Sequence, residues 1–429
     1  MTPTAAPARR GRGDLLVVGA ALTTGVLGVV TLVVAQQHLG LDAFAPLAQL
    51  WTIWAVLAAG LTFSFQQWAA VQDVDRTSLL PGGAATRPLV GLALMGVAIF
   101  LLTTGLRETI FGSSAMVWPV AAGLLPFGTA FNGVRRGQLA RHRQRLGLAA
   151  VIAGENAIRL VVTVTLVVLD ADPVWFAGAL LSGFLVVFGP TVGESAVADE
   201  PDRAGMATLG ASATAGFLAY AFMFGSPLLL ALAGGDAAEV SALFLVLTGV
   251  RLPFIVLQAV VPQLAVALAT STDRARSLVR VRRAILLTAV VGTVAGILVG
   301  YTLGDLVIGT VFSIRGEVAA VAYGLLAGAS ILSACALIAT VALVVERRSR
   351  RILVAWGLPT VSAVVVTASG VIAEPTALAT WLLAAHATVA VLALIPPRAG
   401  QAGSRLDEPT SHSDATHSSR SQRRPGDSR

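Results

Sequence analysis

Apolar runs of about 20 residues recur along almost the whole length of this sequence. Such a run is long enough to cross the roughly 30 Å hydrocarbon core of a bilayer as an α-helix, which rises about 1.5 Å per residue. Only 12% of the 429 residues are charged, about half of the roughly 25% that is typical of soluble domains. The sequence does not show the alternating segments of about ten residues that build a transmembrane β-barrel. We therefore predict an all-α polytopic membrane protein.

Hydropathy predicts twelve spans, each close to the length that crosses a bilayer. The segment at 239–268 is long and contains Pro253 and Pro262, so we expect it to be kinked or tilted. The predicted spans are residues 14–35, 45–63, 88–106, 114–133, 146–169, 174–190, 207–232, 239–268, 283–303, 318–345, 352–372 and 377–395.

The arginines orient these spans. Of the 30 arginines, 26 fall in the terminal segments and in the connections on one side of the predicted membrane, and only Arg107 and Arg315 fall on the other side. Cytoplasmic segments carry the Lys/Arg excess, so we predict that both termini are cytoplasmic and that the protein resides in the cytoplasmic membrane. Tryptophans near predicted helix ends, such as Trp51, are expected at the headgroup level.

One polar connection, "TVGESAVADEPDRAGM" at residues 191–206, divides the spans six and six. Both groups of six start from the cytoplasm, as in transporters built from parallel repeats. We predict a first lobe at 14–190 and a second at 207–396, with 191–206 as a cytoplasmic linker. The N-terminal segment 1–13 is predicted to be a cytoplasmic tail. The segment 397–429 is rich in Ser, Gly, Pro and charge, which predicts a disordered cytoplasmic tail.

The stretch "GTVAGILVG" places Gly292, Gly296 and Gly300 at four-residue intervals on one face of a span. Small residues at this spacing let two membrane helices approach closely. We predict that this face packs against another helix of the same chain.

Ionisable residues interrupt two of the spans. Glu155, Asn156 and Arg159 lie in the fifth, with Glu155 roughly 14 Å and Arg159 roughly 20 Å from the end at Arg145. Their spacing of four residues predicts a Glu155–Arg159 pair on one helix face, which must point at protein or water because a charge facing lipid costs several kcal/mol. Arg251 lies in the eighth span, two residues before Pro253. This proline removes a helix hydrogen bond and can leave a nearby carbonyl free for the guanidinium to bind.

Two interpretations of these residues stay open: an ion-pair network that holds helices together, and the lining of a substrate cavity. For the second, the candidate substrate-binding residues are Glu155, Asn156, Arg159 and Arg251. Two arginines and one glutamate give a net charge of +1, which favours an anionic headgroup, because guanidinium groups match phosphate geometry. An exporter of organic cations is expected to present carboxylates instead.

The sequence contains none of the usual enzyme motifs. We find no phosphate-binding loop of the GxxxxGK[ST] type, no HExxH and no GxSxG. It also lacks a cluster of metal ligands, and Cys335 in its apolar run is expected to be a small buried residue. We therefore predict a protein that is not an enzyme, with no cofactor and no metal.

Three stretches resemble the polysaccharide biosynthesis membrane proteins, the O-antigen-type flippases of the multidrug/oligosaccharidyl-lipid/polysaccharide exporter superfamily, as found in actinobacteria. They are "RRGQLARHRQRLGLAAVIAGENAIRL", "LTFSFQQWAAVQD" at 61–73 and "ALFLVLTGVRLPFIVLQAVVPQL" at 242–264. The resemblance implies two six-helix lobes around a central cavity and alternating access that moves a lipid-linked glycan outward. Carried over, Glu155 and Arg159 face the cavity from the first lobe and Arg251 faces it from the second.

The predicted function is therefore a flippase for a polyprenyl-(pyro)phosphate-linked saccharide. The alternatives are an ion-coupled multidrug antiporter of the same superfamily and a non-transporting scaffold for glycan-assembly enzymes. A major facilitator carrier ranks lower, because the loop "QDVDRTSLLPGGAATR" shares only a fragment of the G-x-x-x-D-R-x-G-R-R motif of that class. The expected partners are the lipid-linked saccharide, membrane lipids and glycan-assembly enzymes. No nucleic-acid partner is expected, because the basic residues follow the membrane topology.

Overall fold

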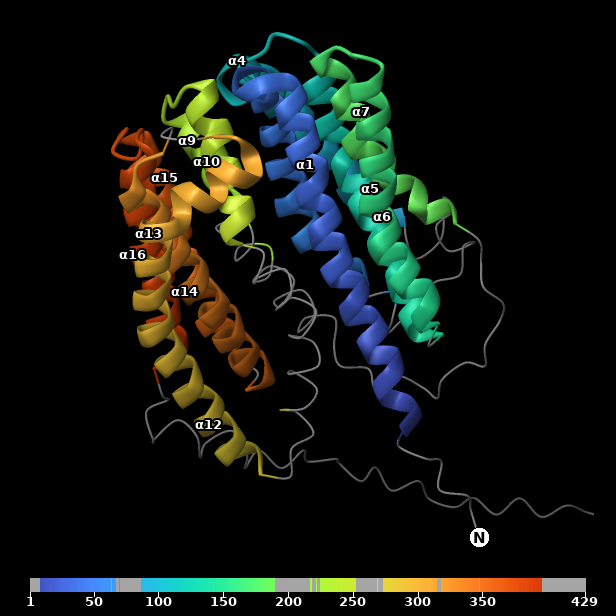
Figure 1. The fold of residues 1–429 in the computed structure, drawn as a ribbon. Helices are drawn as coiled ribbons and strands as arrows, with labels where there is room; N and C mark the ends of the chain where they lie inside the picture. Colours follow the sequence, from blue (N-terminus) through green and yellow to red (C-terminus); the bar gives the residue numbers. More distant parts are fainter. Residues whose placement is uncertain are drawn as a thin grey trace, which may run out of the picture. The chain divides into compact units, whose positions relative to one another are not determined.

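Every regular element that the structure describes is helical (Figure 1). The computed structural model describes residues 8–62, 64–66, 69, 86–142, 144–189, 217, 221, 224–251, 268, 273–314, 318–346 and 348–395. The main helices are α1 (Ala8–Leu57), α3 (Thr86–Gly105), α4 (Arg107–Phe111), α5 (Val117–Arg141), α6 (Arg145–Val168), α7 (Phe176–Ser182), α9 (Ser226–Leu232), α10 (Ala237–Val250), α12 (Arg274–Leu287), α13 (Thr293–Phe312), α14 (Ala320–Val345), α15 (Ser349–Ala368) and α16 (Pro375–Leu394). Short 3₁₀ segments at Pro173–Trp175 and Gly183–Phe188 flank α7, and π-helical turns at Ala58–Thr62 and Thr288–Gly292 follow α1 and α12.

Seven helical segments within the described residues are long and apolar enough to cross a membrane, and three shorter apolar helices accompany them. The first of the seven, Leu15–Gln66, has 52 residues and contains both of the first two predicted spans. The other nine helices lie at nine further predicted spans. The span predicted at 207–232 is described only in part, through residues 217, 221 and 224–232, and the last stretch includes α9.

The long helix α1 is broken at Gly40. This glycine has φ 74° and ψ 170°, a region of backbone space that is essentially restricted to glycine. The break separates the two spans predicted at 14–35 and 45–63. The helix itself begins earlier than expected, because α1 starts at Ala8, inside the predicted N-terminal tail of residues 1–13.

The predicted basic connection between the fourth and fifth spans is mostly helix. α5 continues through Arg141 and α6 begins at Arg145, so only residues 142–144 separate them. The assignment of Arg135 and Arg136 to a loop was therefore wrong. Hydropathy falls after Asn132, but Arg, Leu, Gln and Ala all favour the helical backbone, so the helix continues beyond the apolar run.

Several predictions fall outside the described residues. They concern the linker at 191–206, the tail at 397–429 and the segment 252–267 with both of its prolines. The described part of the eighth span ends with α10 at Val250, and Arg251 follows as its C-terminal cap residue.

Within each half of the chain the helices pack against one another, in some pairs across long stretches of sequence (Figure 1). In the first half α1 packs against α6 and α3 against α5, and in the second half α14 packs against both α13 and α16. The predicted glycine face is confirmed on α13 and the π-helical turn before it. A Cβ on Gly300 would lie 2.6 Å from the Tyr323 carbonyl oxygen, and one on Gly296 would lie 2.5 Å from Ile331. The small residues thus let α13 approach α14 closely.

The two halves meet where α1, after its break, contacts α9 and α10. The Gln49 Nε2 atom donates to the Pro227 carbonyl oxygen at 2.9 Å, and the Ser241 hydroxyl donates to the Leu41 carbonyl oxygen at 2.7 Å. Rings of Phe44 and Phe244 lie with centroids 6.0 Å apart. These residues join the two halves through one continuous apolar core.

Candidate functional site

The polar residues of the fifth span all lie on one face of α6. Glu155, Asn156 and Arg159 are buried, whereas Val161 and Val168 on the opposite side are 66% and 78% exposed. This confirms the prediction that the charged face points at protein. The apolar exposed face is the one that suits lipid.

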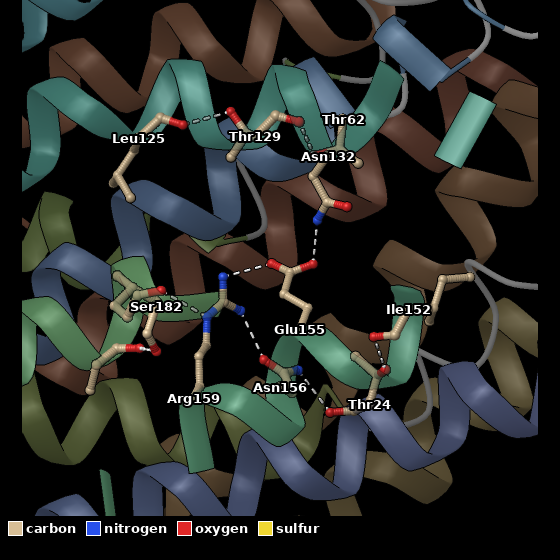
Figure 2. A network of polar contacts seen from close by, with 12 residues as sticks. Thr24, Thr62, Leu125, Thr129, Asn132, Ile152, Glu155, Asn156, Arg159 and Ser182 are labelled. Carbon is tan, nitrogen blue, oxygen red and sulfur yellow. Dashed lines mark hydrogen bonds and ion pairs between the residues drawn. The ribbon is translucent and has the colours of Figure 1, made fainter. Parts of the chain in front are cut away.

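Glu155 forms the predicted ion pair with Arg159 and has two further partners, of which Figure 2 shows Asn132. Its Oε1 atom accepts from the Arg159 Nη2 atom at 2.6 Å. Its Oε2 atom accepts from the Asn132 Nδ2 atom at 2.5 Å and from the Arg136 Nη2 atom at 2.7 Å. One carboxylate, 5% exposed, therefore binds two guanidinium groups that come from two helices.

Arg159 is completely enclosed. Its guanidinium donates three hydrogen bonds: Nε to the Leu180 carbonyl oxygen at 2.9 Å, Nη1 to Asn156 Oδ1 at 2.8 Å and Nη2 to Glu155. Its side chain is 0% exposed. The arrangement connects α6 to α7 and uses most of the donor capacity of this arginine inside the protein.

Aromatic rings cover the same guanidinium. The Arg159 Cζ atom lies 4.1 Å from the ring centroid of Trp54 and 5.6 and 5.7 Å from those of Trp51 and Phe184, which stabilises a buried cation. Trp51 is only 7% exposed, so its ring packs inside the protein, and the headgroup level expected for it stays a prediction. Gly183 makes room for the arginine, since a Cβ there would lie 2.5 Å from Arg159 Nε.

Asn156 joins α6 to α1. Its Nδ2 atom donates to the Thr24 carbonyl oxygen at 2.9 Å, and the Thr24 hydroxyl donates back to the Ile152 carbonyl oxygen at 2.6 Å (Figure 2). Its Oδ1 atom also accepts from Arg159, so both polar ends of the Asn156 side chain hold other parts of the protein in position. The structure thus brings together the three site residues that were predicted on α6.

Two members of this cluster were missed in the sequence. Asn132 and Arg136 lie on α5, one helical turn apart, and both donate to Glu155. Arg136 was assigned to a loop because hydropathy ends the fourth span near Asn132. The signal that could have placed both on one helix face was their spacing of four residues. The residues around Arg136 include good helix formers, so a helix could have been predicted to continue there.

Arg251 lies in the second half and is held quite differently. It is 5% exposed, and its Nη2 atom donates to the Ser226 hydroxyl at 3.3 Å, while its Cζ atom lies 5.0 Å from the ring centroid of Phe224. The buried His386 lies within electrostatic range. Among the described residues no carboxylate pairs with Arg251, and no hydrogen bond or ion pair joins it to the Glu155 cluster.

The buried charge of the described helices is positive. Arg135, Arg159 and Arg251 are buried, against Glu155 alone among the acidic residues, and the partly exposed Arg136 adds a further cation. The excess is larger than the two arginines and one glutamate expected from the sequence. The described residues contain no group of three or more His, Cys, Asp or Glu side chains that could hold a metal ion.

No family model matches the sequence, and no curated protein matches it either. Solved structures do match the fold over most of the chain. The inward-facing structure of a multidrug resistance MATE family transporter of the MOP superfamily has 15% identity and a TM-score of 0.58, with 89% of this chain and 96% of that chain covered.

Two further structures are similar to a comparable degree. A eukaryotic MATE transporter has 14% identity, with 90% of this chain and 95% of that one covered, at a TM-score of 0.56. A MOP superfamily transporter from Pyrococcus furiosus, for which a reversed polarity of the binding pocket suggests a different function, has 11% identity, 89% and 94% coverage and a TM-score of 0.56. These likenesses confirm the predicted fold, an all-α membrane protein with twelve helices in two lobes.

Proposed function

We propose that this chain is a membrane transporter that moves an anionic amphiphile, a polyprenyl-(pyro)phosphate-linked saccharide, outward across the cytoplasmic membrane. Transport would proceed by alternating access of a cavity between the two lobes, with both termini in the cytoplasm. Membrane lipids and glycan-assembly enzymes are its expected partners, and no cofactor is required.

The observation that carries this proposal is the excess of buried arginine, above all Arg251. A buried charge without a partner is costly, so proteins normally pair it. Among the described residues, Arg251 has one long hydrogen bond to a hydroxyl and one aromatic ring beside it. A phosphate group would supply an anion and would match the planar guanidinium with two parallel hydrogen bonds.

The similar solved structures are compatible with an anionic substrate. Structures of similar fold are known in inward-facing and outward-facing conformations, which is what alternating access requires. The fold also occurs in a transporter from Pyrococcus furiosus whose pocket polarity is reversed. The same architecture therefore accommodates binding pockets of opposite charge, and the arginine excess of this chain favours an anionic ligand.

An ion-coupled multidrug antiporter is the second candidate, because the similar structures include multidrug and other MATE transporters. Many drugs handled by such a mechanism would be organic cations, and a positive interior repels them. Among the described residues, three buried arginines stand against one buried glutamate, which favours the anionic substrate over this alternative.

The proposal gives the four predicted site residues different tasks. Arg251 is the anchor for the phosphate in the second half. Arg159 and Asn156 are positioning residues that fix Glu155 and connect α6 to α7 and α1, because their polar groups are already engaged. Glu155 sets the charge of the first half.

The direct test is ligand binding by the purified protein in detergent, followed by tryptophan fluorescence. Farnesyl pyrophosphate, uncharged farnesol and the lipophilic cation tetraphenylphosphonium are the three probes. We expect preference for farnesyl pyrophosphate, an affinity loss of about tenfold or more in Arg251→Ala, and an intermediate loss in Arg251→Lys, which keeps the charge but not the fork. The exposed Arg276→Ala is the matched control and should bind normally.

Preference for tetraphenylphosphonium, with no loss in Arg251→Ala, would favour the antiporter instead. In cells, deletion of the gene should cause a lipid-linked saccharide to accumulate in the cytoplasmic leaflet. Complementation with wild-type protein should reverse this accumulation, and Arg251→Ala at matched abundance should not.

A further inference from the structure

Arg136 and Arg159 bind the same carboxylate but differ in what else they touch. Each places its Nη2 atom close to Glu155, at 2.7 and 2.6 Å. The Arg159 side chain is 0% exposed and donates two further hydrogen bonds. The Arg136 side chain is 18% exposed, and within the described residues Glu155 is its one hydrogen-bond partner. Its Nε atom is buried and has no acceptor among the described residues, so the described part of the protein leaves some of the donor capacity of Arg136 unused.

The position of Arg136 along the bundle is also distinctive. It lies five residues before the end of α5 at Arg141, or about 8 Å along the helix. Glu155 lies ten residues into α6, about 15 Å from Arg145. The Arg136 side chain therefore reaches from near the helix end, the predicted cytoplasmic side, toward the interior. A headgroup that arrives from the cytoplasm meets Arg136 before it meets Arg159.

We propose that Arg136 is the first-half residue that binds the anionic headgroup, with Glu155 serving as an internal counter-anion that holds Arg136 until the headgroup displaces it. This inference rests on the proposed function. It assigns substrate contact to a residue outside the predicted site, and it gives Arg159 a positioning role.

The exchange leaves no charge unpaired. When Arg136 turns to the phosphate, Glu155 still accepts hydrogen bonds from Arg159 and from Asn132. The Arg136 side chain is 18% exposed and that of Arg159 is 0% exposed, so the Arg136–Glu155 contact can open more easily than the enclosed Arg159–Glu155 contact. Only an anion can replace the carboxylate in this exchange. The arrangement therefore selects for negative headgroups and against organic cations.

Chemical restoration of the charge tests this inference. The variant Arg136→Cys, on a Cys335→Ala background, is purified as the full chain and assayed for farnesyl pyrophosphate binding. We expect its affinity to fall about tenfold or more, as for loss of one charge-assisted contact. Modification with a cationic aminoethyl methanethiosulfonate should restore most of the affinity, and the anionic sulfonatoethyl reagent should not. Bound farnesyl pyrophosphate should slow both reactions.

The second half offers a closely matched control. Arg282 pairs with Glu346 at 2.7 Å and its side chain is 19% exposed, so Arg282→Cys removes a similar ion pair away from the site. We expect this variant to bind farnesyl pyrophosphate normally, before and after modification. Similar losses in both variants, or equal restoration by both reagents, would mean that Arg136 only holds helices together and would overturn the inference.

The outcomes also separate this inference from the proposed function. Normal affinity in Arg136→Cys, with the expected loss in Arg251→Ala, overturns the inference and leaves the proposed function standing. Failure of the wild-type protein to prefer farnesyl pyrophosphate over farnesol overturns the proposed function itself. If Arg136→Cys does not fold, Arg136→Lys and Arg136→Gln replace it. Retained affinity in the lysine variant and lost affinity in the glutamine variant support the inference, and equal affinities overturn it.

Discussion

The substitution Glu155→Gln tests how the charges of the first half are balanced. It keeps the size of the side chain and removes the one negative charge that Arg136 and Arg159 share. The amide can still accept a hydrogen bond from one guanidinium. Two cations would then face each other across a group with no net charge.

The magnitude follows from the burial of the partners. Removing one member of a buried ion pair costs about 3–5 kcal/mol, because the other charge stays buried. Arg159 is 0% exposed and cannot reach water, whereas the Arg136 side chain is 18% exposed and can turn toward it. We therefore expect a loss near the lower limit, about 3 kcal/mol in the free energy of unfolding.

Glu346 provides the matched control. It also binds two arginines, Arg282 at 2.7 Å and Arg348 at 3.2 Å, but all three side chains are between 15% and 27% exposed. Water reaches all three of these side chains, so no charge stays fully enclosed when Glu346 is neutralised, and the loss should lie closer to the value of about 1 kcal/mol for solvent-exposed pairs. The assay is unfolding in mixed micelles with a rising fraction of dodecyl sulfate, followed by tryptophan fluorescence. Glu155→Gln should unfold at a clearly lower fraction than Glu346→Gln.

A third variant shows whether the loss comes from uncompensated charge. Adding Arg136→Gln to Glu155→Gln removes one of the two cations, so the double variant should be more stable than the sum of the single effects predicts. Coupling energies of residues in contact are typically about 0.5–3 kcal/mol. Equal losses for Glu155→Gln and Glu346→Gln, or strictly additive losses for the pair, would refute the reasoning.

Two further variants test packing and topology. Gly183→Ala should lower the free energy of unfolding by about 1–3 kcal/mol in the same micelle assay, because its Cβ would lie 2.5 Å from Arg159 Nε. The control is Gly178→Ala, where a Cβ meets nothing within 4 Å. Equal effects of the two variants would contradict the packing argument. Arg276→Cys on a Cys335→Ala background should resist an impermeant maleimide in intact cells and react after permeabilisation, since the Arg276 side chain is 80% exposed on the predicted cytoplasmic side. Labelling of intact cells would reverse the orientation.

The parts of the site that could be predicted from the sequence are local ones. Residues four apart on a helix must share a face, so Glu155 and Arg159 were placed together before any fold was known. The cost of exposing charge to lipid then predicted that this face is buried. The first statement depends on helical geometry and the second on the cost of a charge in lipid, and neither requires a tertiary contact to be known.

The remaining partners could not be predicted because they depend on tertiary contacts. Trp54 and Leu180 reach Arg159 from other helices, and no pattern in their own segments indicates this. Arg136 was missed for a different reason. Hydropathy measures where a helix leaves the membrane and not where it ends, so a helix that continues into a basic stretch was assigned to a loop.

The two halves of the chain balance their buried charge in different ways. In the first half the protein supplies its own anion, since Glu155 neutralises Arg159 and holds Arg136. In the second half the structure describes Arg251 with a hydroxyl and an aromatic ring as its neighbours. A phosphate bound at Arg251 would neutralise this arginine, as Glu155 neutralises Arg159 on α6.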